Sequence, residues 1–305
     1  MFVYVSGNKN KMGFCKFSPI TNEKSEKSNP DNFRLAGVSD DFLFWFSGFT
    51  DAEANFLIIL DRSFVKFRFK ISLHLDDIEV LNTIKSKLKI GIVTVENCRG
   101  RCSFIVEKYA DIKNVICPIL NSFLLHTSKN LDFSDFNKVV LIKDYMKKNL
   151  SDTEMERILS LKNGMNSKRK IFTYQVTNSQ IIINPNWFIG FIVGEGTFGI
   201  KTGSALYLQV AQKNTSQESL NAITTFLTKL PNSILQNSKI LTLNVVSTIN
   251  VKTNVVSLVV NSVDSLYYCV LPYLDSCIIY TRKTIDFKLW TIALLLKIYG
   301  YYFLP

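Results

Sequence analysis

The sequence predicts an α+β fold made of two similar halves. One twelve-residue motif occurs twice, as WFSGFTDAEANF at Trp45–Phe56 and as WFIGFIVGEGTF at Trp187–Phe198. Two further pairs of related segments follow in the same order: Glu79–Ile84 with Glu218–Ile223, and Thr127–Phe133 with Thr281–Phe287. Three ordered matches are hard to obtain by chance, so we expect a tandem repeat. Each half is predicted to run helix, strands, helix, strands, helix.

The first half is expected over residues 38–162, after a polar N-terminal tail, residues 1–37, that is rich in Lys, Asn and Ser. Ser39 or Asp40 can cap its first helix, because both side chains accept hydrogen bonds from free backbone N–H groups. Apolar residues then recur at helical spacing, namely Phe42, Trp45, Phe46 and Phe49.

A strand is predicted over Phe64–Leu75, where apolar and polar residues alternate. Its polar face carries Lys66, Arg68, Lys70, Ser72 and His74. In the second half, Leu206, Leu208 and Val210 are expected to face inward and Tyr207, Gln209 and Lys213 outward. A β-ribbon fits the DNA major groove, so these polar residues are candidate DNA contacts. An ordinary solvated sheet face is the alternative.

A helix around Glu79 is expected next, followed by a second hairpin near Ile92–Val95 and Ser103–Val106. The corresponding hairpin of the second half is expected near Leu241–Val246 and Val255–Val260.

The two halves are expected to be joined by a linker over residues 163–186, with an extra strand at Ile171–Val176 inside it. Before it, Ser151 and Glu154 form a capping box that begins a short helix. The second half is expected over residues 187–305.

The composition favours a folded protein with a polyanionic partner. Apolar residues make up 47% of the 305-residue chain, and its formal net charge is +11. No run reaches the roughly 18 apolar residues that a membrane-spanning helix needs, so we expect no membrane partner. Cys98 and Cys102 are the only close cysteine pair, with His74 and His126 far away in sequence, so reduced cysteines are favoured over a zinc site.

The repeated motif places small residues four apart on each predicted helix. Gly48 and Ala52 are one such pair, and Gly190 and Gly194 are the other. A glycine inside a helix costs about 1 kcal/mol relative to alanine, so a compensating contact is expected. Small residues at this spacing would let the two motif helices approach more closely than usual.

Glu53 and Glu195 fall at matched positions in the last turn of these helices. Each carboxylate would lie at the negative end of a helix dipole, and helix pairing would bring the two together. A hard divalent cation removes both penalties, and Mg²⁺ prefers oxygen ligands of this kind. Such a site suits phosphodiester hydrolysis. The alternative is a pair of solvated carboxylates, which the matched recurrence disfavours.

Lys129 and Lys283 form a second matched pair. They are either stabilisers of charge on a scissile phosphate or exposed lysines at the start of equivalent helices. In the second case, Asp132 and Asp286 would complement the helix dipoles.

The two motifs resemble those of single-chain LAGLIDADG homing endonucleases. Three flanking segments are similar to blocks of the organellar intron-encoded branch: FRFKISLHLDD at Phe67–Asp77, LHTSKNLDFSDF at Leu125–Phe136, and VLPYLDSCIIYTRKTIDF at Val270–Phe287. The resemblance covers roughly residues 38–300. It implies two pseudo-symmetric αββαββα halves, whose antiparallel sheets form a DNA-binding saddle on a monomer.

The resemblance also implies an activity and a set of site residues. Glu53 and Glu195, with the backbone carbonyls of Ala52 and Gly194, would bind Mg²⁺. Mn²⁺ would substitute, and Ca²⁺ would bind without supporting cleavage. Both strands of a long pseudo-palindromic double-stranded DNA site would be cut, leaving short 3′ overhangs.

The remaining implied roles depend on matched positions. Lys129 and Lys283 would lie near the cut phosphates, and Gln212 near the attacking water; Leu73, the first-half counterpart of Gln212, could not act there. Val193 stands where the first motif has Asp51, a position that is usually not a metal ligand, so we expect activity to survive.

Two other functions remain open on the same fold. An intron RNA maturase would bind RNA as a splicing cofactor, and its surface need not use the carboxylates. A catalytically inactive DNA-binding module would be expected to lack Glu53 or Glu195, and both are present. The richness in Phe, Ile, Asn and Lys suits an AT-rich genome, so a mitochondrial location is expected, with the protein encoded in the organelle and needing no transit peptide.

Overall fold

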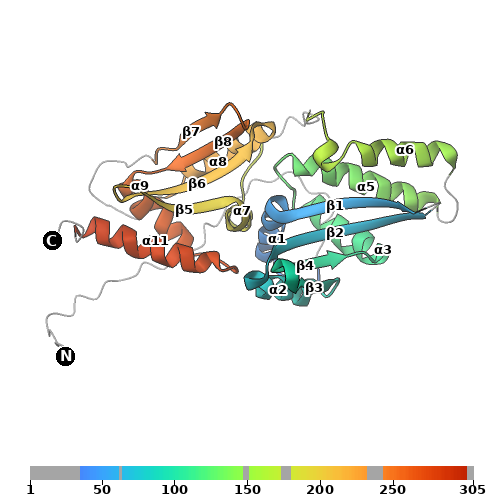
Figure 1. Cartoon of the computed structure of the whole chain (residues 1–305), viewed down its shortest axis with the longest axis horizontal. Coiled ribbons are helices and arrows are strands. Elements are labelled where there is room, and N and C mark those ends of the chain that lie inside the picture. The colour runs from blue at the N-terminus through green and yellow to red at the C-terminus, as the bar shows by residue number, and fades with distance from the viewer. Residues whose placement is uncertain (1–34, 62–63, 147–150, 173–179, 232–242, 301–305) are drawn as a thin grey trace. The chain divides into compact units, whose positions relative to one another are not determined.

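The computed structural model describes residues 35–61, 64–146, 151–172, 180–231 and 243–300. Within these ranges the fold contains two four-stranded antiparallel sheets with helices packed on them (Figure 1). The strand orders are β1-β2-β4-β3 in the first sheet and β5-β6-β8-β7 in the second. Because the two orders correspond strand for strand, the predicted α+β repeat is confirmed.

The first half contains the following helices and strands: α1 (Asp40–Glu53), β1 (Ala54–Asp61), β2 (Phe64–His74), α2 (Ile78–Leu88), β3 (Ile92–Glu96), β4 (Arg101–Val106), α3 (Tyr109–Asp111), α4 (Cys117–Ser122) and α5 (Lys129–Met146). A π-helical turn, Ile112–Ile116, joins α3 to α4.

After α6 (Asp152–Asn163), the second half repeats this order with α7 (Pro185–Glu195), β5 (Gly196–Lys201), β6 (Ala205–Lys213), α8 (Gln217–Thr228), β7 (Val246–Asn250), β8 (Val255–Val260), α9 (Val263–Ser265), α10 (Leu271–Asp275) and α11 (Lys283–Ile298). A π-helical turn recurs at Leu266–Val270, the place that matches the first half.

Local sequence signals set the helix starts. The Ser39 side chain accepts a hydrogen bond from the Phe42 N–H, so Ser39 is the cap of α1. The predicted capping box of Ser151 and Glu154 is present at α6. Asn184 caps α7, which begins with Pro185 at a position where its missing N–H costs nothing.

The alternation predicted for the central strands is confirmed. Val65, Phe67, Phe69 and Ile71 of β2 are at most 2% exposed, and Leu206, Leu208 and Val210 of β6 are equally buried. Aromatic side chains fill the space behind the first sheet, including Phe56, which packs against Phe69 and Phe136. Each sheet therefore keeps its opposite face free of the core.

Two expected strands differ from the structure. The strand expected near Leu241–Val246 is wrong at residues 243–245, which lie outside any strand, since β7 begins at Val246 and Leu243 is a buried residue before it; residues 241–242 lie outside the described ranges. Every residue of β7 is exposed, so no apolar alternation marks it in the sequence. The extra strand expected at Ile171–Val176 is absent at residues 171–172, and its remainder, like the tail, lies outside the described residues.

The segment after α6 is tied to the first half. Arg169 forms ion pairs with Asp132 at 2.8 Å and Asp135 at 2.7 Å. The Asn166 side chain donates to the Phe56 carbonyl at 2.9 Å. The start of the predicted linker therefore packs on α5 and β1, while the domain limits themselves remain predictions.

The two halves meet along α1 and α7, as the small residues predicted. A Cβ added to Gly48 would lie 1.9 Å from the Trp187 carbonyl oxygen. One added to Gly190 would lie 2.0 Å from the Trp45 carbonyl oxygen. Each glycine is thus in direct contact with the backbone of the opposite helix, and this contact offsets the cost of glycine in a helix interior.

Candidate active site at the paired helix ends

The close packing of α1 and α7 brings their final residues together. Glu53 ends α1 and Glu195 ends α7. A Cβ added to Gly194 would lie 2.4 Å from the Ala52 Cβ and 2.9 Å from Glu53 Oε1. Gly194 is therefore required where the helices end, because any side chain there would displace the Glu53 carboxylate.

Both glutamates lie in an environment that disfavours their charge. Burial raises the pKa of Glu53, and the negative charge of Glu195 raises it further. Burial also raises the pKa of Glu195, whereas a hydrogen bond from the Gln212 side chain acts in the opposite direction. The positive charges of Lys129 and Lys283 lower both pKa values. These four charged groups and Gln212 thus form one electrostatic cluster.

The side-chain amine of each lysine contacts the C-terminal end of one motif helix. Lys129 Nζ donates to the Ala52 carbonyl at 3.0 Å and to the Thr50 carbonyl at 3.3 Å. Lys283 Nζ donates to the Gly196 carbonyl, directly after α7. Both side chains are partly buried, and burial lowers the pKa of each. This placement does not fit the alternative of two exposed lysines.

Asp51 has a role in the site that its sequence position did not reveal. Its carboxylate is 2% exposed and accepts hydrogen bonds from the His126 N–H at 2.5 Å, the Thr127 N–H at 3.1 Å and the Thr127 hydroxyl. It therefore holds the loop that leads into Lys129. Burial raises the pKa of Asp51 despite these bonds. The matched residue in α7, Val193, is buried and offers no acceptor.

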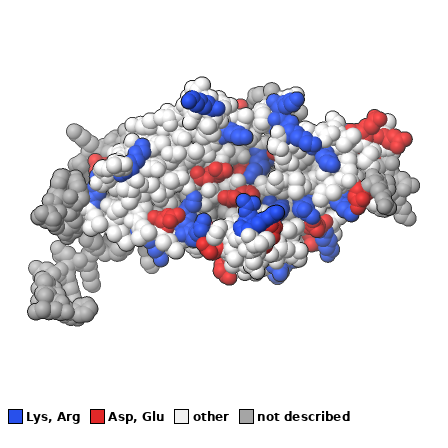
Figure 2. Space-filling view, viewed as in Figure 1, with Lys and Arg blue, Asp and Glu red and all other residues white. Residues whose placement is uncertain are grey.

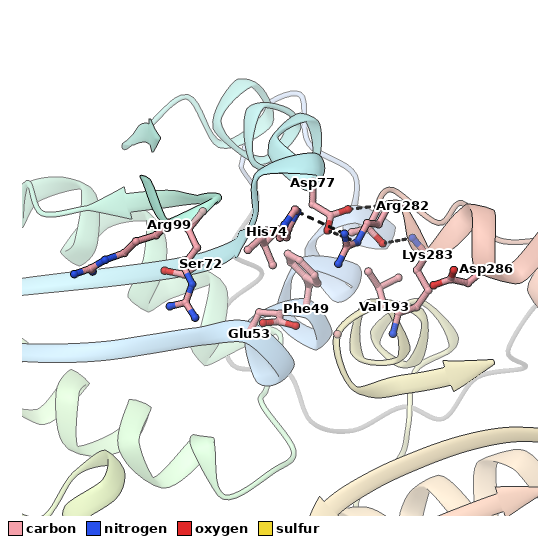
Figure 3. A pocket seen from close by; sticks show the side chains of 14 residues that line it. Phe49, Glu53, Ser72, His74, Asp77, Arg99, Val193, Arg282, Lys283 and Asp286 are labelled. Atoms are coloured by element: carbon pink, nitrogen blue, oxygen red, sulfur yellow. Dashed lines mark hydrogen bonds and ion pairs between the residues drawn. The ribbon is translucent and has the colours of Figure 1, made fainter. Parts of the chain in front are cut away.

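A pocket of about 740 Å³ opens beside these helix ends (Figure 3). Its lining joins the candidate residues Glu53, Gly194 and Lys283 to Leu73 of β2. Further charged residues line it that sequence reasoning did not single out: Asp77, Arg99, Arg101 and Arg282. Helical or strand periodicity cannot find these residues, because they lie in turns or at element ends and meet only in the folded chain.

The donor set of the helix ends fits a hard divalent cation. Burial raises the pKa of both carboxyls and the charge of Glu195 raises that of Glu53 further, and a cation bound to both would remove that cost. No group of three or more His, Cys, Asp or Glu side chains in the described part of the chain could hold a metal ion. A cation at Glu53 and Glu195 would therefore complete its shell with backbone carbonyls, water or substrate oxygens, as Mg²⁺ commonly does.

The polar face of β2 already carries a network of side-chain interactions. Lys66 pairs with Asp61 at 2.6 Å, and Arg68 pairs with Glu107 at 2.5 Å. The Ser72 hydroxyl lies 3.0 Å from that of Ser103 on β4. The side chains of the two ion pairs are 38% to 60% exposed, so a ligand could exchange these ion pairs at low cost.

His74 and Lys70 complete this face. His74 is opposite Arg101 in the β2–β4 ladder, so Arg101 extends the basic face onto β4. Lys70 is half-buried between its neighbours on β1 and β4, Asn55 and Ile105. On the face drawn in Figure 2, Lys and Arg side chains lie around acidic groups in the middle of the view.

The second sheet presents a less charged face. Tyr207 packs directly over Gly199, and Lys201 lies 5.2 Å from its ring centroid. Gln209 donates to the Ser257 hydroxyl at 3.4 Å. Lys213 is exposed at the end of β6. The two candidate faces are therefore similar in position but different in charge.

Comparison with known proteins gives one family for both halves. The sequence model of the LAGLIDADG endonuclease family matches residues 46–140 and 188–294. An uncharacterized mitochondrial protein of Saccharomyces cerevisiae, RF1, is 26% identical over 276 residues, covering 87% of this chain and 57% of that protein. A probable intron-encoded endonuclease 2 of Neurospora crassa is 29% identical over 51% of this chain and 34% of its own length. The chain thus spans about half or less of these relatives.

A solved structure has the same fold. I-SmaMI, bound to an uncleaved DNA target in the presence of calcium ions, superimposes with a TM-score of 0.73 at 18% identity, over 86% of this chain and 94% of that one. Within the described ranges, no helix combines the length and the apolar character that a bilayer-spanning segment needs.

Proposed function

Because the chain belongs to the LAGLIDADG endonuclease family, we propose that it is a site-specific double-strand DNA endonuclease. The observation that carries this proposal is the pair of carboxylates at the ends of α1 and α7, flanked by one lysine each. A monomer with an internal pseudo-twofold relation between its halves would have one reaction centre for each DNA strand. The cut site would be long and pseudo-palindromic, with short 3′ overhangs.

We propose that Glu53 and Glu195, together with the carbonyl oxygens of Ala52 and Gly194, hold Mg²⁺. When bound, the ion would supply an activated water and offset negative charge on the phosphate. Mn²⁺ would replace it, whereas Ca²⁺ would bind without supporting cleavage; the solved I-SmaMI complex with calcium contains uncleaved DNA.

The neighbouring side chains would act on the phosphate and the water. Lys129 and Lys283 would donate hydrogen bonds to phosphate oxygens and stabilise the charge that develops there. To do so, Lys129 would leave its hydrogen bond to the Ala52 carbonyl, which frees that oxygen for the metal. Gln212, which bonds to Glu195, would orient the attacking water on its side of the site. Leu73 lines the pocket and has no polar group for this task.

The sheet faces would contact the DNA grooves. Lys66, Arg68, Lys70, Ser72 and His74 would do so in the first half, and Tyr207, Gln209 and Lys213 in the second. Alternating side chains on a ribbon are spaced to reach successive base edges and phosphates. The mitochondrial and intron-encoded relatives support a mitochondrial location.

The test is a cleavage selection on a randomised DNA library, run with Mg²⁺ and with Ca²⁺. Cutting of one long site with Mg²⁺ alone would support the endonuclease and supply its target. No cutting, together with tight binding to a structured intron RNA, would overturn the proposal in favour of an RNA maturase.

A further inference from the structure

The two loops that lead into Lys129 and Lys283 are each tied to the opposite half of the molecule. The Ser128 N–H donates to the Ser216 hydroxyl at 3.0 Å. The Arg282 N–H donates to Asp77 Oδ1 at 2.7 Å. Ser216 and Asp77 occupy the same place in their halves, the residue before α8 and before α2. The residue preceding each lysine is therefore bound by the helix start of the other half.

Neither Asp77 nor Ser216 uses its side chain to cap its own helix. A residue of either type at this position normally accepts a hydrogen bond from the first turn. Here the Asp77 and Ser216 side chains make no such bond with α2 and α8. Both side chains are instead used in contacts between the halves, which points to a role in holding the lysine loops.

The two ties differ in what else supports each loop. The loop before Lys129 is also held by Asp51 through the N–H groups of His126 and Thr127. The matched residue on the other side is Val193, which is buried and has no acceptor. Loss of the Ser216 contact would therefore leave one loop anchored by a carboxylate, whereas Asp77 supplies the carboxylate hydrogen bond of the other loop, whose Tyr280 also packs on Trp45.

Arg282 adds charge to the tie that has no counterpart of Asp51. Its guanidinium lies 3.1 Å from Asp76 and 3.5 Å from Asp77, and it reaches His74 Nδ1 at 3.5 Å (Figure 3). The Asp77 side chain is only 11% exposed and that of Arg282 is 52% exposed, so solvent screens this pair from the arginine side, and the backbone hydrogen bond from the Arg282 N–H is the better defined part of the tie. In Figure 3, Arg282 lies between Asp77 and Lys283.

We infer that Asp77, through Arg282, is a positioning residue for Lys283 and so for the centre at the end of α7. The inference rests on the proposed endonuclease function. Lys129 bonds at the end of α1 and Lys283 at the end of α7, so each lysine serves a different scissile phosphate. Loss of the Asp77 tie then slows the cutting of one strand more than the other. A nicked product accumulates.

The test compares Asp77→Ala with Ser216→Ala, the matched variant of the other half. Strand-resolved cleavage of a target duplex, labelled on each strand, gives two rate constants. Asp77→Ala is expected to change their ratio by about 10-fold, less than the roughly 100-fold that a 1 Å displacement of a reacting group can cost, because Arg282 keeps its ion pair with Asp76. Ser216→Ala is expected to keep this ratio within about 2-fold of the wild-type value, because Asp51 still holds the loop before Lys129. Equal slowing of both strands by Asp77→Ala, or the same imbalance in Ser216→Ala, overturns the inference.

Asp77→Asn keeps an oxygen that can accept from the Arg282 N–H but loses the charge, so its imbalance should be smaller than that of Asp77→Ala. It also guards against misfolding of the alanine variant.

Hydrogen exchange of the peptide around Arg282 provides a readout that needs no cleavage. Asp77→Ala should speed exchange there, and Ser216→Ala should not. Unchanged exchange disproves the tie. If the tie is present but the wild type cuts no DNA, the proposed function fails instead.

Discussion

Glu53 and Glu195 are the residues on which the proposed chemistry depends most directly. Replacing either by glutamine removes a charged oxygen donor and keeps the side-chain volume. We expect Glu53→Gln and Glu195→Gln each to lower cleavage by at least about 100-fold, the scale of losing one stabilising group in an active site. Binding to the target should persist. Gel-shift and cleavage assays on the same duplex check both expectations, with the exposed Glu79→Gln as a control. Normal cleavage by either variant would show that the site assignment is wrong.

His126 provides a separate prediction about stability and pH. Its ring packs on Trp187 with centroids 4.8 Å apart, and burial lowers the pKa of His126 to about 4, from 6.5. A histidine with a lowered folded pKa stabilises the fold above its unfolded pKa. This contribution is lost as pH falls from about 6.5 to about 4, and it amounts to at most about 3 kcal/mol. His126→Phe should therefore lose less stability over this range.

Urea unfolding at pH 7 and pH 4.5 measures this difference. Asp51, Glu53 and Glu195 have raised pKa values and act with the opposite sign, so the comparison must be made between His126→Phe and the wild type rather than on the wild type alone. The same pH dependence in both proteins would contradict the role assigned to His126.

Among the helices, α1 and α7 are in backbone contact, and a substitution at Gly48 tests whether this contact holds the two halves together. Gly48→Ala improves the helix propensity of its site by about 1 kcal/mol. Its new Cβ would lie 1.9 Å from a carbonyl oxygen of α7, however, so the helices must move apart. We expect a net loss of at least about 2 kcal/mol in the free energy of unfolding. Gly164→Ala is the matched control, because its Cβ would have ordinary contacts beginning at 3.4 Å. Equal stability of the two variants would rule out the tight contact.

For the strands, a prediction from sequence succeeds where one face of the strand is buried in the core. Strands β2 and β6 alternate in hydrophobicity because one face is in the core, and both were predicted. Strand β7 is exposed throughout, so its register follows only from its partner β8. The capping box at α6 is local in sequence and was predicted together with its helix.

For the molecule as a whole, tandem repetition allowed the sequence to predict both halves and the meeting of Glu53 with Glu195. It could not predict the Asp77–Arg282 tie, because these residues are 205 positions apart and belong to different halves. Repetition also hides asymmetry between the halves. The second motif has Val193 where the first has Asp51, and only the structure shows that Asp51 accepts hydrogen bonds from Thr127, which Val193 cannot do for its own half. The differences between the halves thus carry information that the repeat does not.

The unequal charge of the two sheet faces leads to a prediction for DNA binding by the whole molecule. Three basic residues lie on β2, at Lys66, Arg68 and Lys70, whereas the matched positions on β6 include the neutral Tyr207 and Gln209. Counterion release makes affinity fall with salt in proportion to the number of neutralised phosphates. Lys70→Ala should therefore weaken binding to all sequences and reduce the salt slope by about 1. Gln209→Ala should leave that slope unchanged and relax base preference in one half-site only. Binding titrations at several salt concentrations, on targets varied in each half-site, separate the two effects. If both variants changed the slope equally, the two sheets would contact DNA in the same way, and charge would not distinguish the halves.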